Sequence, residues 1–158
     1  MKGLLALLLL AAAAACSHAP APAAVAGAPA SDGLVIVESA YSFEETLAKL
    51  EAALALRNLQ PLKIDHATNA AGAQLSLRPT ILFLFGNPRG GTPLMMLAPA
   101  AGIDLPLKAL VYEEDGKTMV VMTDIDYLAR RHAISPDAAP LAGIRKLLAD
   151  VASEATGR

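Results

Sequence analysis

The chain has 158 residues, which is enough for one domain. Its 13 basic and 15 acidic residues give a net charge of −2, so nothing favours nucleic acid as a partner. The single cysteine excludes an internal disulfide.

Residues 1–16 resemble a bacterial signal peptide. A charged start at Lys2 precedes an unbroken apolar run from Leu4 to Ala15, which is too short to cross about 30 Å of hydrocarbon as a helix. Cys16 then follows three alanines, as in a lipobox whose usual Leu is replaced by Ala13. We expect Cys16 to be lipidated, with Ser17 directing the protein to the outer membrane on the periplasmic side of the envelope. The alternative is ordinary cleavage, which would give a soluble periplasmic or secreted protein.

Residues 17–33 are rich in Pro, Ala and Gly and nearly uncharged, so they predict a tether that cannot bury enough surface to fold. The folded domain is expected over residues 34–155. A lipid-anchored form would contact the membrane through its anchor alone.

The first predicted elements are a strand from Leu34 to about Ala40 and a helix that follows it. The segment Ser42–Glu45 fits a capping box, and apolar residues at helical spacing continue to Leu54. A second strand is predicted over Leu62–His66, with His66 half-buried on the face of Leu62 and Ile64. One or two helical turns follow over residues 67–73.

The middle of the chain predicts a buried strand and a loop. The run Ile81–Phe85 is apolar at every position, which indicates a strand that is covered on both faces or lies at a dimer contact. Asn87-Pro88 and Gly90-Gly91 predict turns, and Thr92 is predicted to cap a short helix over Leu94–Leu97.

The last third predicts a hairpin and two helices. Asp115-Gly116 separates two apolar strands, Leu107–Tyr112 and Thr118–Met122. Asp124 is placed to cap a helix over Ile125–Arg131, and a final helix becomes regular from Pro140. The whole order predicts an α+β fold, with a single antiparallel-rich sheet and helices on one face.

Several of these segments together resemble the domain of unknown function 302 family. The pieces that carry the resemblance are Ser42–Leu47, Ile64-Asp65-His66, Leu77–Thr80, Phe85–Pro88, Gly91–Met95, Asp104–Lys108 and Leu128–His132. The resemblance implies a β-α-β4-α fold similar to the TATA-box-binding-protein-like group, and a homodimer. It implies no reaction, and likeness of fold to a DNA-binding protein is no argument for DNA binding.

A speculative ligand site centres on the loop after Phe85 and on the polar residues around it. Its candidate residues are Arg78, Asn87, Thr92, Asp104, Lys108, Arg131 and His132. These side chains either frame a pocket or form a polar network that fastens the loop to the sheet. The leading hypothesis is an envelope-tethered module that binds a small ligand or a partner protein.

Two other functions stay open. His66 and His132 are weak candidates for metal ligation, but no spacing typical of a metal site links them, so neither a metal nor a cofactor is predicted. A metal- or His-dependent enzyme using His66, Asp104 and His132 is the alternative, although no catalytic motif stands out. A structural homodimer without a ligand is the further alternative.

Overall fold

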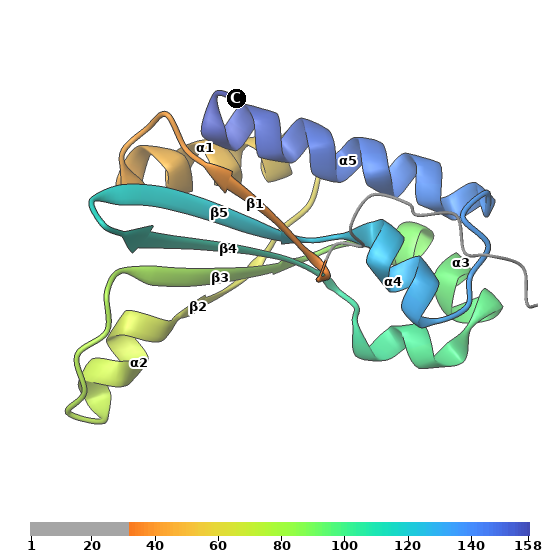
Figure 1. Ribbon diagram of the computed structural model, residues 1–158, viewed down its shortest axis with the longest axis horizontal. Helices are drawn as coiled ribbons and strands as arrows, with labels where there is room; N and C mark the ends of the chain where they lie inside the picture. The colour runs from red at the N-terminus through yellow and green to blue at the C-terminus, as the bar shows by residue number, and fades with distance from the viewer. Residues whose placement is uncertain (1–31) are drawn as a thin grey trace, which may run out of the picture.

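The computed structural model describes residues 32–158, so the predictions for the signal peptide, Cys16 and nearly all of the tether lie outside the described residues. The domain is built on one five-stranded antiparallel sheet in the order β1-β5-β4-β3-β2 (Figure 1). The strands are β1 Leu34–Glu38, β2 Leu62–Asp65, β3 Thr80–Phe85, β4 Leu107–Glu114 and β5 Lys117–Thr123. The predicted α+β fold with an antiparallel sheet is confirmed.

Two long helices, α1 (Phe43–Ala55) and α5 (Ala139–Thr156), pack against each other over one face of the sheet (Figure 1). The short helix α2 (His66–Gly72) lies at one end of the sheet. The opposite end carries α3 (Pro88–Leu97), the 3-10 helix η1 (Pro99–Ile103) and α4 (Ile125–Arg131). Connections at that end are therefore much longer than the β4–β5 hairpin at the other.

The core lies between the sheet and the two long helices. Phe83 of β3 and Val111 of β4 are fully buried in one apolar cluster with Leu50 and Leu54 of α1 and Leu141 of α5. Burial of large apolar side chains on one face of the sheet is the main force that holds the long helices to it.

Two local predictions are confirmed, and a third, the capping box, is confirmed only in part. Ser42 caps α1 by accepting from the Glu45 amide at 3.2 Å, although the Glu45 carboxylate lies 3.7 Å from Lys49 rather than closing the capping box. Asp124 caps α4 by accepting from the amides of Asp126 and Tyr127, at 2.8 and 3.2 Å. Asp115 and Gly116 have φ angles of 50° and 74°, as a tight hairpin turn requires.

The prediction that His66 ends a strand is wrong. The strand stops at Asp65, whose carboxylate accepts from the Thr68 amide at 2.9 Å and so begins α2 at His66. Apolar and polar residues alternate from Leu62 to His66, and this pattern predicts a strand that continues through Asp65. The same Asp65 is also a favoured helix cap, and in the structure it acts as one.

The prediction that Thr92 caps a short helix is also wrong. Helix α3 begins at Pro88, and Asn87 is its cap, accepting from the Gly90 amide at 2.9 Å. Asn-Pro predicted a turn, but the same pair is favoured as a cap followed by proline at the first helical position. Thr92 and Pro93 consequently lie inside α3.

The apolar strand β3 has one face against the helices and one face without a helix over it. Phe83 and Phe85 are buried, while Leu82 and Leu84 point to the opposite face and are only half-buried. Coverage of both faces within the described part of the chain is therefore wrong, and a dimer contact stays a prediction.

The two termini of the described domain lie at different ends of the sheet. Leu34, at the start of β1, pairs with Thr123, which immediately precedes the α4 cap. At the other end, the Ala40 amide donates to the carbonyl of Thr156 in the last turn of α5, at 2.8 Å. The C-terminus is therefore near the β4–β5 hairpin (Figure 1).

Candidate functional site

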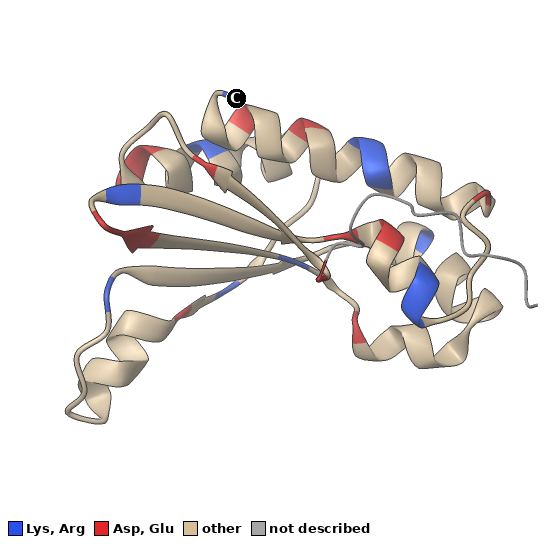
Figure 2. Cartoon of the chain, viewed as in Figure 1, with Lys and Arg blue, Asp and Glu red and all other residues tan. Residues whose placement is uncertain are grey.

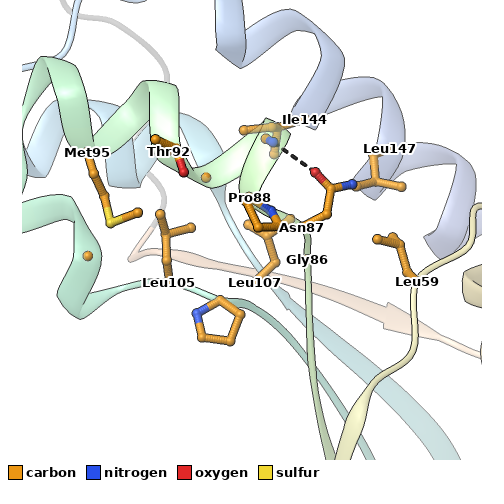
Figure 3. Close-up of a pocket in the computed structure, with 14 residues that line it drawn as sticks. Leu59, Gly86, Asn87, Pro88, Thr92, Met95, Leu105, Leu107, Ile144 and Leu147 are labelled. Carbon is orange, nitrogen blue, oxygen red and sulfur yellow. Dashed lines mark hydrogen bonds between the residues drawn. The ribbon is translucent and has the colours of Figure 1, made fainter.

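A cavity of about 380 Å³ lies at the end of the sheet where β3 leaves and β4 enters. Its walls come from the loop before β2, from α3, from η1 and the turn after it, and from α5 (Figure 3). The lining residues are Leu59, Gly86, Asn87, Pro88, Gly90, Gly91, Thr92, Met95, Gly102, Leu105, Pro106, Leu107, Ile144 and Leu147.

Glycines in the cavity wall allow neighbouring lining side chains to approach closely. A Cβ placed on Gly91 of α3 would lie 3.4 Å from a methyl group of Leu105, and one on Gly102 of η1 would lie 3.2 Å from the sulfur of Met95. Leu94, which is fully buried, anchors α3 to the core. The helix is thus held in place while its glycines keep part of the wall close to the opposite side chains.

The lining is apolar apart from the side chains of Asn87 and Thr92, and none of its residues is ionisable. Asn87 accepts from the Gly90 amide through its oxygen, so its amide nitrogen is the group left for a ligand. Neither that nitrogen nor the Thr92 hydroxyl hydrogen-bonds to any residue within 32–158.

Beside the cavity, Asp104 is the centre of a polar network. Its carboxylate accepts from His132 Nε2 at 2.5 Å and from Arg131 at 3.1 Å. The Lys108 ammonium donates to the carbonyls of Asp104 and Pro106, at 2.8 and 3.1 Å. The His132 side chain is only 8% exposed. Together these bonds join the end of α4 and the start of β4 to the segment between η1 and β4.

This network supports a wall of the cavity rather than lining it. Asp104 stands between Gly102 and Leu105, both of which line the cavity, while the Asp104 carboxylate binds outward to α4. The two interpretations of the polar loop therefore apply to different residues: Asn87 and Thr92 border a pocket, and Asp104 with its partners fastens the loop.

The structure does not bring every candidate residue to this place. Arg78 forms an exposed ion pair with Glu114 at 2.7 Å, near the β4–β5 hairpin. Conversely, sequence reasoning missed most of the apolar lining, including Leu59, Ile144 and Leu147. Those residues come from distant segments, and an apolar side chain at helical spacing carries no signal that it faces a cavity instead of the core.

The alternative of an enzyme using His66, Asp104 and His132 finds no common site. His66 begins α2, whereas the Asp104–His132 pair lies at the α4 end of the sheet (Figure 1). The neighbouring Asp65 has a lowered pKa because the Thr68 amide and hydroxyl donate to it, which is a consequence of its capping role. Across residues 32–158, no three His, Cys, Asp or Glu side chains gather to hold a metal ion.

Charged side chains are scattered over the described domain rather than collected at the cavity (Figure 2). One cluster joins the turn after α1 to α5, where Arg57 donates to both Glu154 oxygens at 2.9 and 2.7 Å and lies 3.5 Å from Asp150. These hydrogen bonds raise the pKa of Arg57 and lower that of Glu154. No helix in the part of the chain that the structure describes is long and apolar enough to cross a membrane.

Similar proteins include three from Brucella, each 39% identical over 104 residues, or 65% of this chain. Those from Brucella suis and Brucella abortus are named fluoride-specific ion channel FluC 1, and that from Brucella melitensis is named fluoride-specific ion channel FluC 2. The match covers 41%, 38% and 38% of these proteins, so the chain spans about two fifths of the length of the curated relatives it matches. Their name describes the whole proteins.

A solved structure and a family profile agree with each other. The crystal structure of an uncharacterized conserved protein from Bacillus stearothermophilus superposes with a TM-score of 0.70 over 79% of this chain and 99% of that one, at 21% identity, and so shares the fold. The profile of the domain of unknown function DUF302 matches residues 35–154. The resemblance seen in the sequence is confirmed, and the chain belongs to the DUF302 family.

Proposed function

We propose that this domain is a binding module for a small molecule, which it holds in the cavity between α3 and α5. The observation that carries the proposal is the cavity itself: about 380 Å³ of space with apolar walls and two polar side chains in its lining. Ligand sites commonly have volumes of about 300–1,000 Å³ and mostly apolar linings with a few polar groups.

Covering apolar walls with an apolar ligand is favourable because it removes their surface from water. Water gains little beside walls that offer few polar partners. A ligand in the cavity would gain dispersion contacts with those walls, while the Asp104 network keeps the wall in place without it.

The test is to fill the cavity with a side chain. In Gly91→Leu the new side chain would project toward Leu105, and replacing a helical glycine does not weaken α3. Gly143→Leu is the matched control, because this glycine also lies in a helix and its Cβ would meet nothing within 4 Å. Metabolites would be screened by thermal shift, and each hit measured by calorimetry on all three proteins.

We expect hits to lose binding in Gly91→Leu and to keep it in Gly143→Leu. Equal binding to wild type and Gly91→Leu would contradict the proposal, as would a screen without a cavity-dependent hit. Sodium fluoride belongs in the screen because of the names of the Brucella relatives. The cavity walls contain no cationic side chain, so fluoride is not the ligand that we propose.

We also propose that the protein acts at the bacterial envelope, on the basis of residues 1–16 and Cys16. Lipidation at Cys16 would place the full-length protein in the membrane fraction, and Cys16→Ala would move it to the soluble fraction. An unchanged distribution would contradict the anchor.

A second candidate function, a structural homodimer, is favoured by the sheet face that has no helix over it. Leu82, Leu110 and Val121 are aligned across three neighbouring strands on that face, and Ile36 beside them is 53% exposed. Apolar faces of this kind often mark an interface. If a second copy covers the face, Leu110→Lys would convert a dimer into a monomer in sedimentation equilibrium. A wild-type monomer would contradict this assembly.

A further inference from the structure

We propose that the cavity selects an uncharged, largely apolar molecule with one hydrogen-bond acceptor, which is received by the side-chain amide of Asn87. This inference rests on the proposed function and names the class of ligand for the same cavity. The walls without charge, the direction of the one fixed polar group and the size of the apolar space together favour this class of ligand.

The walls offer no partner to a charged ligand. None of the lining residues is ionisable. Lys108 and Arg131 are engaged with Asp104, and Arg89 of α3, which lies between two lining residues, is not itself part of the lining. An ionised group in apolar surroundings loses its hydration and is strongly disfavoured unless it is paired. A carboxylate or an ammonium group inside this cavity would have no pair, so the ligand is neutral.

The lining offers a hydrogen-bond donor at Asn87. Because the Gly90 amide donates to the side-chain oxygen of Asn87 at 2.9 Å, the identity of the two amide atoms is fixed by that bond. Figure 3 shows the oxygen facing Gly90 and the amide nitrogen on the side of Leu147, which also lines the cavity. A ligand therefore meets an N–H group at this position, and its complement is an acceptor such as a carbonyl or ether oxygen.

The rest of the cavity suits a compact apolar body. Leu59, Ile144 and Leu147 supply rigid aliphatic walls on one side, while Leu105 and the flexible Met95 lie on the other (Figure 3). An engineered apolar cavity of about 150 Å³ accommodates benzene. The cavity of about 380 Å³ therefore has room for a substituted ring or a branched aliphatic chain of similar bulk.

The test compares four probes of similar size on the full-length protein: ethylbenzene, acetophenone, 1-phenylethylammonium and benzoate. Acetophenone should bind about three- to ten-fold more tightly than ethylbenzene, which is the range expected of one net hydrogen bond. Both charged probes should bind at least ten-fold more weakly than acetophenone. Dissociation constants would come from ligand-observed NMR titrations.

The decisive variant is Asn87→Asp, which preserves the cap on α3 because aspartate caps a helix as well as asparagine does. It keeps an oxygen for the Gly90 amide and removes the N–H donor. We expect the preference for acetophenone over ethylbenzene to disappear while ethylbenzene binding changes little. Thermal melting of the variant without ligand would confirm that the fold and cap are retained.

The proposal is overturned if benzoate or 1-phenylethylammonium binds as tightly as acetophenone. It is also overturned if none of the four probes binds, or if the acetophenone preference survives Asn87→Asp. The proposed function fails separately, because its evidence is the loss of screened hits in Gly91→Leu, whatever the charge of those hits. A charged hit that Gly91→Leu abolishes would sustain the cavity as the site and reject the ligand class.

Discussion

The two ends of the sheet differ in how they use their polar residues. At the β4–β5 hairpin, Glu38 pairs with Lys117 and Arg78 pairs with Glu114, all on exposed side chains. At the other end, Asp104 binds a nearly buried histidine and stands beside the cavity wall. Surface ion pairs contribute little to stability, whereas a polar group bound to a buried partner is costly to remove.

The comparison shows that polar residues close together in the sequence need not act together. Arg78 and Asn87 lie within one short stretch, but β3 carries the chain from one end of the sheet to the other between them. A strand of six residues spans roughly 20 Å. Polar residues that precede and follow a strand are therefore separated by its full length.

The largest effect should come from the residue that anchors α3. Leu94→Ala removes the only α3 side chain that is buried, and we expect a loss of about 2–5 kcal/mol in the free energy of unfolding, as is typical for a core leucine. Met96→Ala, on the same helix at 80% exposure, should change it by less than about 0.5 kcal/mol. Urea denaturation measures both, and equal effects would break the distinction between an anchored helix side and a free one.

An intermediate effect should come from the Asp104 network. Asp104→Ala leaves His132 without its partner and should cost about 1–3 kcal/mol. The variant should also reduce the affinity for ligands whose binding Gly91→Leu abolishes, because the segment bearing Leu105 loses its attachment to α4. Asp104→Asn retains an acceptor for His132 and should lose less. Wild-type stability and binding in Asp104→Ala would show that this end of the sheet is no more dependent on its polar contacts than the hairpin end.

The smallest effect should come from the hairpin. The Lys117 ammonium donates to Glu38 at 2.8 Å and lowers the pKa of Glu38 below its ordinary value of 4.5. A carboxyl group whose pKa is lowered by folding stabilises the folded state at pH values above its unfolded-state pKa. This contribution is lost as the pH falls through the folded-state pKa. Lys117→Gln should therefore reduce Tm slightly at pH 7 and flatten the decrease in Tm below about pH 4.5. Melting curves at several pH values measure this, and a larger effect than that of Asp104→Ala would reverse the comparison.

Much of the fold could be predicted because its signals are local. The residues that make up each signal are close together in the sequence, and each signal forms the expected element. They are the Ser42 and Asp124 caps, the Asp115-Gly116 turn and the apolar face of the last helix. The errors at His66 and Thr92 are also local. In both cases a capping residue, Asp65 or Asn87, stands before the expected start of the helix and begins it earlier.

The candidate site could be predicted only in part. Gly91 and Asn87 were conspicuous as a loop rich in glycine and proline, but the cavity depends on Leu59 and Ile144, which no local pattern connects to that loop. The packing of α5 against α3 determines which apolar side chains face empty space. That is a property of the folded chain, and the sequence records it only as ordinary helical periodicity.

The opposed ends of the described domain determine how the protein is best handled. A fusion partner, dye or surface linker attached in front of residue 34 would stand beside α4, at the end of the sheet that holds the cavity. One attached after Arg158 would stand beside the hairpin, with the length of the sheet between it and the cavity. Immobilisation through the C-terminus is therefore the geometry that leaves the cavity accessible to solutes.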